Sequence, residues 1–474
     1  MAKFGGTASP QAVLKQAMVL HQAGRLQEAV AHYRQVLKSH PNSAPVLTYC
    51  GAALLGLKQS FEAQQMLAAA VAADSKNADA HTYLGNAHQM AGRLEQAAQS
   101  YAAALEIQPN NAALQNNLGV LLQKRGCCEA AIGHFQKAVT LQPRYAQALN
   151  NLAQAEVKRG QPAAAQAAAS KAVEIEPSYA EAHNTLGSAQ SAIGDHAAAI
   201  CSFRKAVELR PKYTEALHNL AVALVIDGEA VEAVDMCNRT LALAPASIPA
   251  LATKTVALGQ AERDGEMAAL IGYGTHIRAH TVDPTPDYPD LATFNADLVE
   301  QILAHPSLAF EPDGHATRKG RHTGELLSGE PGPFATFERI INDAVEAYRT
   351  AQPPGPCHPV NATAPKRWAL TAWSVVFEEE GHQVPHIHES GWLSGVYYPK
   401  VPRDIGENAD DPRGWIEFGR PQALYGATRT PPVHLIRPEE GLIVLFPSYA
   451  FHCTVPTGSR ELRVSVAFDV MPRG

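Results

Sequence analysis

Residues 382–399 read HQVPHIHESGWLSGVYYP, residues 438–453 read PEEGLIVLFPSYAFHC, and residues 459–470 read SRELRVSVAFDV. These segments decide the fold of the carboxy-terminal half, because they are short β-rich runs separated by Gly and Pro turns. His386 and His388 stand two positions apart, so on an extended strand both imidazoles project from the same face. Such a pair can chelate a metal ion.

A third histidine and an arginine follow on later segments. The apolar run from Gly441 to Phe446 ends at Pro447 and precedes His452. A further extended run carries Arg463 and Ser465, again two apart and on one face. We expect a β-barrel in which three histidines converge on one ion, with the guanidinium farther down the same cavity. Neutral imidazoles suit iron, zinc, copper and nickel, and an open facial set of three protein ligands suits non-haem Fe(II).

This combination of motifs resembles a bacterial and phage subgroup of the 2-oxoglutarate/Fe(II)-dependent oxygenases, which have the double-stranded β-helix fold. The subgroup shows an HxH, then SGVYY, then G-x-x-x-x-F-P-S, a distal His and an R-x-S strand. The matching residues here are His386 to His388, Ser394 to Tyr398, Gly441 to Ser448, His452, and Arg463 to Ser465. The resemblance covers residues 290–474 and implies two cofactors, Fe(II) and 2-oxoglutarate.

The resemblance implies that His386, His388 and His452 are catalytic metal ligands. The usual facial site has two histidines and one carboxylate, written His-x-Asp or His-x-Glu with a distant His. His388 stands at the carboxylate position, so three alternatives are open: a three-His site, Glu389 as the third ligand, or two histidines and water. Glu389 should face away on a regular strand, which favours His388.

The resemblance also implies a site for 2-oxoglutarate. The spacing of Arg463 from His452 is close to that between the distal ligand and the basic residue that holds the far carboxylate of 2-oxoglutarate in this class. A planar guanidinium can grip a carboxylate through two hydrogen bonds, and Ser465 can add a hydroxyl donor. Tyr397 and Tyr398 alternate in direction, so only one can face the cavity; the sequence does not say which, and we name Tyr398 as the candidate.

The amino-terminal half is organised by a repeat of 34 residues, which is the period of tetratricopeptide repeats. Each repeat has a characteristic glycine, alanine and proline, and Lys58 stands where one repeat lacks the glycine. The glycine suits a left-handed turn between two helices, the alanine lets helices approach closely, and the proline ends the second helix. The recurring residues are Ala29, Ala63, Ala97, Ala131, Ala165, Ala199 and Ala233, then Gly24, Gly92, Gly126, Gly160, Gly194 and Gly228, and Pro41, Pro109, Pro143, Pro177, Pro211 and Pro245.

We therefore predict a multidomain α plus β protein. Residues 9–246 form an α-solenoid of seven tetratricopeptide repeats, whose first helices line a concave face. Residues 247–289 form capping helices and a Pro-rich linker that ends in DPTPDYP. Residues 290–474 form a double-stranded β-helix, or jelly-roll, with flanking helices. We expect the basic segment GHATRKGRHTGELL, residues 314–327, to be a loop.

Asparagine recurs at Asn117, Asn151 and Asn219, just before the leucine of a recurring Leu-Gly or Leu-Ala pair. This pattern resembles the asparagine ladder of O-linked N-acetylglucosamine transferase, where the amides hold an extended peptide backbone. We expect a protein or peptide partner on the concave face. The alternative is that these amides are simply solvated.

Composition narrows the choice of partner and compartment. The 474-residue chain has a net charge of -7, which argues against nucleic acid as a partner. No apolar run reaches the roughly 18–20 residues that a membrane-spanning helix needs, and the start lacks an apolar signal region. Seven cysteines are an odd number, and reduced thiols in the cytoplasm are the simplest interpretation.

Three functions compete. The leading hypothesis is an Fe(II)/2-oxoglutarate-dependent dioxygenase that hydroxylates a protein or peptide captured by the repeat groove. The second is a cupin-type metal enzyme without 2-oxoglutarate, because Gly441, Pro447 and His452 nearly fit the second cupin motif, although Tyr449 stands where that motif has Gly. The third is a non-enzymatic tetratricopeptide adaptor with a relic barrel.

Overall fold

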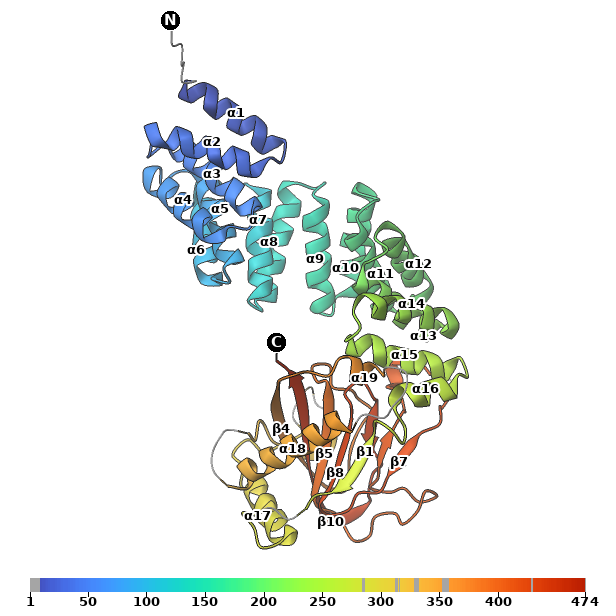
Figure 1. The fold of residues 1–474 in the computed structure, drawn as a ribbon. Helices are drawn as coiled ribbons and strands as arrows, with labels where there is room; N and C mark the ends of the chain where they lie inside the picture. The colour runs from blue at the N-terminus through green and yellow to red at the C-terminus, as the bar shows by residue number, and fades with distance from the viewer. Residues whose placement is uncertain are drawn as a thin grey trace, which may run out of the picture. The chain divides into compact units, whose positions relative to one another are not determined.

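The computed structural model describes residues 9–283, 286–311, 314, 316–327, 332–351, 358–427 and 429–473. The chain divides into two compact units, Met1–Leu209 and Arg210–Gly474. Figure 1 shows the first unit as paired antiparallel helices, and the second as further helices followed by the β-sheet region. None of the helices in this described part combines the length and the apolar character that crossing a membrane requires.

The first unit confirms the tetratricopeptide repeats and the physical reasons for their pattern. The seven recurring alanines, six in this unit and Ala233 in the second, are all 0 % exposed, so each lies where two helices approach closely. Five of the six recurring glycines lie in this unit, and all have positive φ, as does Lys58 at the missing glycine position. The helices are α1 (Pro10–Gln22), α2 (Leu26–Ser39), α3 (Ala44–Gly56), α4 (Ser60–Ala73), α5 (Ala78–Met90), α6 (Leu94–Ile107), α7 (Ala112–Lys124), α8 (Cys128–Leu141), α9 (Ala146–Lys158), α10 (Pro162–Ile175), α11 (Ala180–Ile193) and α12 (His196–Leu209).

A second column of glycines makes room for aromatic rings between the helices of a repeat. A Cβ atom built on Gly119 would lie 2.6 Å from the Phe135 ring, and one on Gly187 would lie 2.7 Å from the Phe203 ring. The fifth repeat has alanine at both corresponding positions, Ala153 and Ala169, and both are fully buried. Large and small residues therefore alternate across the helix pair to keep the packing dense.

The second unit begins with four helices, α13 (Thr214–Asp227), α14 (Ala230–Leu243), α15 (Ile248–Gln260) and α16 (Asp264–Ile271). Glu262 stands 34 residues after Gly228 and shares its positive φ, so α15 and α16 repeat the turn geometry of the earlier pairs. The helix α16 is shorter and ends at Gly272 in the left-handed conformation. The predicted domain boundaries at residues 246 and 289 stay predictions.

Two antiparallel sheets follow in the described residues. One has the strand order β1-β8-β5-β10-β4-β3-β2, and the other has the order β7-β6-β9. The central strand β10 pairs with both β4 and β5. The strands are β1 (Arg278–Thr281), β2 (Ala309–Phe310), β3 (Thr317–His322), β4 (Trp368–Gln383), β5 (Leu393–Lys400), β6 (Ile416–Phe418), β7 (His434–Ile436), β8 (Leu442–Pro447), β9 (His452–Thr454) and β10 (Ser459–Pro472).

Helices cover one face of the larger sheet. The flanking helices are α17 (Leu291–Leu303) and α18 (Pro333–Thr350), and the short helices α19 (Pro359–Ala362) and η1 (Ala423–Tyr425) follow. On β5 the Tyr397 hydroxyl donates to Asn295 of α17 over 2.5 Å, and on β10 the Phe468 ring meets Phe337 of α18 edge-on. Because side chains alternate along a strand, Tyr398 and the neighbours of Phe468 face the other way, into the space between the sheets.

The loop predicted for residues 314–327 is wrong over β3. This strand pairs with β4, and its buried positions are Thr317, Gly320 and His322. Its basic residues lie outside, where Arg321 pairs with Glu378 of β4. Cross-strand charge pairs of this kind stabilise a sheet, so the basic composition marks a solvent-facing strand instead of a loop.

Candidate functional site

The three predicted histidines lie together between the two sheets. The ring nitrogens that His386, His388 and His452 can offer to an ion all lie within 4.8 Å of one another. The backbones of His386 and His452 form an isolated antiparallel bridge, with N–H···O distances of 3.0 and 3.1 Å. The His388 N–H donates to the carbonyl of Ser448 over 3.0 Å. The HxH segment is therefore held by backbone bonds to the segment around β9, and not by a regular ladder.

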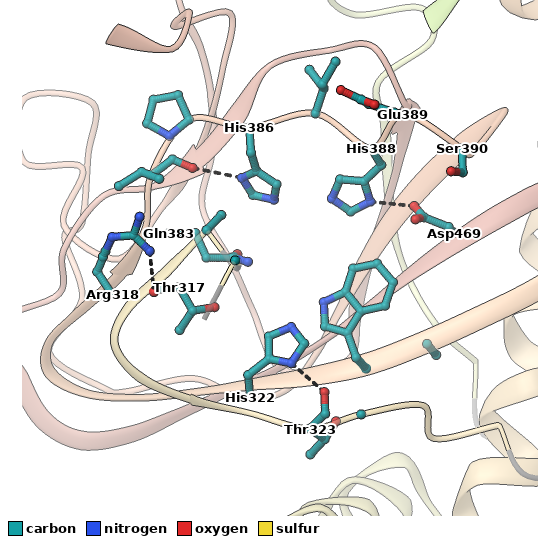
Figure 2. Close-up of a pocket in the computed structure, with 18 of the residues that line it drawn as sticks. Thr317, Arg318, His322, Thr323, Gln383, His386, His388, Glu389, Ser390 and Asp469 are labelled. Atoms are coloured by element: carbon teal, nitrogen blue, oxygen red, sulfur yellow. Dashed lines mark hydrogen bonds and ion pairs between the residues drawn. The ribbon is translucent and has the colours of Figure 1, made fainter. Parts of the chain in front are cut away.

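Each imidazole is oriented through its Nδ1 atom. His386 Nδ1 lies 2.9 Å from the carbonyl of Val384, and His452 Nδ1 lies 3.1 Å from the carbonyl of Ala450. A carbonyl only accepts, so these Nδ1 atoms carry the proton and leave Nε2 with a free lone pair. His388 Nδ1 lies 2.5 Å from a carboxylate oxygen of Asp469 (Figure 2). This is the arrangement in which histidines present Nε2 to a metal ion.

The electrostatics of the cluster favour neutral imidazoles at His386 and His452. Burial, followed by the charge of His388, lowers the pKa of His386 to about 3. Burial and the two neighbouring histidines also hold the pKa of His452 well below its usual value. A neutral imidazole has the lone pair that a metal ligand needs. Among the described residues, the one cluster of His, Cys, Asp and Glu groups close enough to share an ion is these three histidines, without Glu389.

Arg463 lies in a small inner cavity that adjoins the histidines. Its side chain is 2 % exposed, and its Nε and Nη1 atoms have no hydrogen-bond partner. Its guanidinium carbon lies 5.4 Å from the ring centroid of Tyr398 and 5.6 Å from that of Phe377. Burial lowers the pKa of Arg463. Ser465 lines the same cavity and donates to the carbonyl of Val375 over 3.4 Å.

These residues fit the cofactors that the sequence suggests. Two buried guanidinium nitrogens without acceptors are costly unless an anion meets them, and a carboxylate has the matching planar shape. Three histidines whose ring nitrogens lie within 4.8 Å of one another suit a divalent transition metal. Tyr398, and not Tyr397, lines the cavity beside Arg463.

A larger outer pocket of about 650 Å³ lies on the other side of the histidines. It shares Gln383, His386 and His388 with the inner cavity. Figure 2 shows His322 facing these histidines from across the pocket, with Arg318 and Glu389 on separate parts of its wall. The pair His386 and His388 therefore stands between a nearly closed chamber and an open one.

Several residues at this site were not predicted from the sequence. Asp469 supports His388, and it could have been found because it shares the strand and the parity of Arg463 and Ser465. Trp373, whose ring centroid lies 5.4 Å from that of His388, lines the outer pocket. His322 also lines it, on the strand β3 that was expected to be a loop.

The families that match this chain divide it into a helical repeat part and a strand-rich part, as its secondary-structure elements do. Residues 371–469 match the family described as "Putative 2OG-Fe(II) oxygenase". Residues 20–86, 91–126, 110–176, 151–214 and 184–248 match families described as tetratricopeptide or TPR repeats. The chain is a tetratricopeptide-repeat protein with a 2OG-Fe(II) oxygenase domain. No curated protein matches it.

Solved structures similar to this tetratricopeptide-repeat protein have low sequence identity. A chain of the APC/C hetero-tetramer Cut9-Hcn1 is 18 % identical over 54 % of this chain, with a TM-score of 0.46, and this chain spans 49 % of it. PilF of Pseudomonas aeruginosa is 19 % identical over 44 % of this chain and 94 % of its own, with a TM-score of 0.41. YrrB, titled a TPR protein with an unusual peptide-binding site, is 21 % identical over 39 % of this chain and 96 % of its own, with a TM-score of 0.34.

The predicted asparagine positions lie in different surroundings. Asn117 lines a groove of about 480 Å³ in the first unit, together with Tyr83 and Met90. The Asn151 amide donates to the side chain of Asn116 over 2.9 Å, so part of its capacity is used within the repeats. Asn219 lies in the second unit, on α13. Their role in holding a peptide stays a prediction.

Proposed function

We propose that the oxygenase domain is an Fe(II)/2-oxoglutarate-dependent dioxygenase that hydroxylates a protein or peptide recruited by the repeats. The observation that carries this proposal is the buried guanidinium of Arg463, whose Nε and Nη1 lack acceptors, in a cavity that also contains the three histidines. A cupin-type site without 2-oxoglutarate has no use for such a cation. A relic barrel would not be expected to keep it, because an unpaired buried charge destabilises the fold.

The proposed roles follow from the contacts. His386, His388 and His452 would hold Fe(II), and Arg463 with Ser465 and Tyr398 would hold the far carboxylate of 2-oxoglutarate. When bound, the two cofactors supply the oxidising power for attack on a C–H bond of the substrate.

The chain's own residues prepare the site. The carbonyls of Val384 and Ala450 fix two imidazoles in the tautomer that leaves Nε2 unprotonated. Phe446 and Ile416 line the inner cavity and limit the access of water. The guanidinium of Arg463 is fixed among rings, so it can orient a carboxylate without reorganising.

The second unit supports the recruitment of a polypeptide substrate. Thr253 stands 34 residues after Asn219, at the same position of the repeat as the recurring asparagines. Its hydroxyl lies 3.2 Å from the Tyr425 hydroxyl of η1, and 3.1 Å from His218 Nε2 on α13. Gln422, just before η1, lines the outer pocket. Thr253 is itself fully buried, so a peptide recruited at Asn219, one repeat earlier in the same unit, would be brought close to this side of the outer pocket. We also propose that the protein acts in the cytoplasm, which the free thiols of the six described cysteines support.

Anaerobic titration of the purified protein with Fe(II) and 2-oxoglutarate tests the proposal. The wild type should develop the visible metal-to-ligand charge-transfer band, and His388→Ala should lose it. Absence of the band in the wild type would overturn the proposal. Arg463→Ala separates the leading hypothesis from a cupin-type enzyme, because loss of turnover with metal binding intact is expected only if 2-oxoglutarate is used.

A further inference from the structure

We propose that Asp469 is a positioning residue that supplies, through His388, the negative charge that a carboxylate ligand gives to other facial metal sites. The inference rests on the proposed function, because it requires a metal ion at the three histidines. It concerns the position where this chain has His388 and the usual facial site has an acidic residue.

The contacts around Asp469 are specific. His388 Nδ1 lies 2.5 Å from Asp469 Oδ1, and the Ser394 hydroxyl donates to the same oxygen over 2.6 Å. The Ser394 hydroxyl also lies 2.9 Å from that of Ser448. The side chains of His388 and Asp469 are 7 % and 13 % exposed, so this pair is largely shielded from water.

His388 differs from the other two histidines in the group that its Nδ1 atom contacts. The Nδ1 atoms of His386 and His452 meet neutral backbone carbonyls, and the Nδ1 of His388 meets a carboxylate. A carboxylate that accepts from Nδ1–H increases the electron density at Nε2 and makes the imidazole a stronger ligand. The imidazole at the acidic position of the motif is thus the one with an anion behind it.

The total charge of the site with a metal ion and 2-oxoglutarate bound also points to Asp469. Of the described residues that line the inner cavity, Arg463 is the one with a charged side chain. A divalent ion and this guanidinium together carry one more positive charge than the dianion 2-oxoglutarate can neutralise. Asp469 would balance that charge, which is unfavourable in a buried cavity. Another buried carboxylate nearby, Glu417, is already paired with Arg420 at 2.5 Å.

Asp469→Asn removes the charge with little change of shape. Both hydrogen bonds to Asp469 end on Oδ1, and an asparagine carbonyl oxygen can accept both. The matched control is Ser394→Ala, which removes one of these hydrogen bonds and keeps the carboxylate. Near-ultraviolet circular dichroism checks that both variants keep the packed core.

The experiment titrates the full-length protein with Co(II) under nitrogen and follows the intrinsic tryptophan fluorescence, to which Trp373, next to His388, contributes. We expect Asp469→Asn to weaken Co(II) binding about 10–100-fold, and Ser394→Ala to stay close to the wild type. In iron-loaded protein, Asp469→Asn should also raise the Fe(III)/Fe(II) midpoint potential, because a lost negative charge disfavours Fe(III) more than Fe(II).

The outcomes separate this inference from the proposed function. Wild-type protein that binds no Co(II) or Fe(II) would overturn both. Metal binding with an unchanged affinity and potential in Asp469→Asn would overturn the role of Asp469 alone. Equal losses in Asp469→Asn and Ser394→Ala would also overturn it, because they would show that the hydrogen-bond network matters and the charge does not.

Discussion

At the scale of single residues, the guanidinium of Arg463 has the clearest consequence. It is buried, and no ion pair to it is found in the described part of the chain. A cation in this position destabilises the free protein and becomes favourable only when an anion binds. Arg463 therefore lowers the stability of the protein when no anion is bound, and it provides a prepared anion site.

Arg463→Met is expected to raise the free energy of unfolding of the co-substrate-free protein by about 1–4 kcal/mol, because methionine fills a similar volume without a charge. Under the proposed function, the same change should abolish the added stabilisation that 2-oxoglutarate gives to the Fe(II)-loaded wild type, and it should leave the stabilisation from Fe(II) alone intact. Urea unfolding followed by tryptophan fluorescence measures both effects, since all four tryptophans lie between residues 368 and 415. Arg460→Met, at an exposed position of β10, is the control and should leave both quantities unchanged.

A stacked histidine pair predicts a pH dependence. The ring centroids of His276 and His358 lie 3.7 Å apart, and burial with the neighbouring charge of His358 lowers the pKa of His276 to about 4 from 6.5. Burial also lowers the pKa of His358. Because both values are lower in the folded state, the unfolded chain binds more protons below pH 6.5, and stability falls as the pH falls toward 4.

His276→Phe should reduce this pH dependence. Between pH 7 and pH 5 the wild type is expected to lose about 1–2 kcal/mol more of its unfolding free energy than the variant does. Urea unfolding at the two pH values, followed by tryptophan fluorescence, measures the difference. Equal losses in the two proteins would show that His276 does not titrate differently in the folded state.

Near the site, the direction of a side chain could be predicted from the sequence where the alternation of side chains along a strand decides it. The parity of Arg463 and Ser465, and the two-residue spacing of His386 and His388, can be read directly from the chain. The acceptors of the Nδ1 atoms could not be predicted, because two of them are backbone carbonyls in irregular segments. Asp469 was available by parity, but its contact with His388 depends on how the HxH segment crosses the sheet.

At the scale of the helix pair, the glycines that lie against aromatic rings lead to a testable prediction about packing. Gly119→Ala should lower the free energy of unfolding by about 1–3 kcal/mol, because the added methyl group would overlap the Phe135 ring. Gly133→Ala is the matched control: Gly133 is exposed on α8, and its Cβ would meet nothing within 4 Å. That change should stabilise the helix by up to about 1 kcal/mol. Urea unfolding followed by far-ultraviolet circular dichroism measures both, and a neutral Gly119→Ala would contradict the packing argument.

The elements themselves were predictable to different degrees. The helices of the repeats follow from a period of 34 residues that is repeated many times, so each repeat supports the others. The apolar strands β4, β5, β8 and β10 follow from their composition. The strands β1 and β3 are short and polar, and only their pairing with β8 and β4 makes them strands, so local sequence could not reveal them.

At the scale of the whole molecule, the terminal helices are part of the structural support of the oxygenase domain. Arg429, in the segment after η1, forms two hydrogen bonds with Asp264 of α16, at 2.6 and 2.5 Å, and donates to the carbonyl of Gly259. The strand β1 covers the edge of β8. The sequence could not predict these contacts, because they join segments that are far apart along the chain.

A fragment of residues 290–474 is therefore expected to be unstable. It would lose β1 and both partners of Arg429, and would leave the edge of β8 open to association. A fragment of residues 210–474 retains all of them and should unfold cooperatively. Size-exclusion chromatography and tryptophan fluorescence in urea compare the two. A monomeric 290–474 fragment with the same unfolding midpoint as the longer one would show that the helices are dispensable.

The two cavities that share Gln383, His386 and His388 have a kinetic consequence. Under the proposed function, a small dicarboxylate that enters by the outer chamber must pass these side chains before a polypeptide substrate blocks the entrance. Turnover should then follow a compulsory order, with the dicarboxylate first and the polypeptide second. An excess of polypeptide would trap the empty protein as a dead-end complex, and initial rates should fall at high polypeptide concentration unless the dicarboxylate is raised with it.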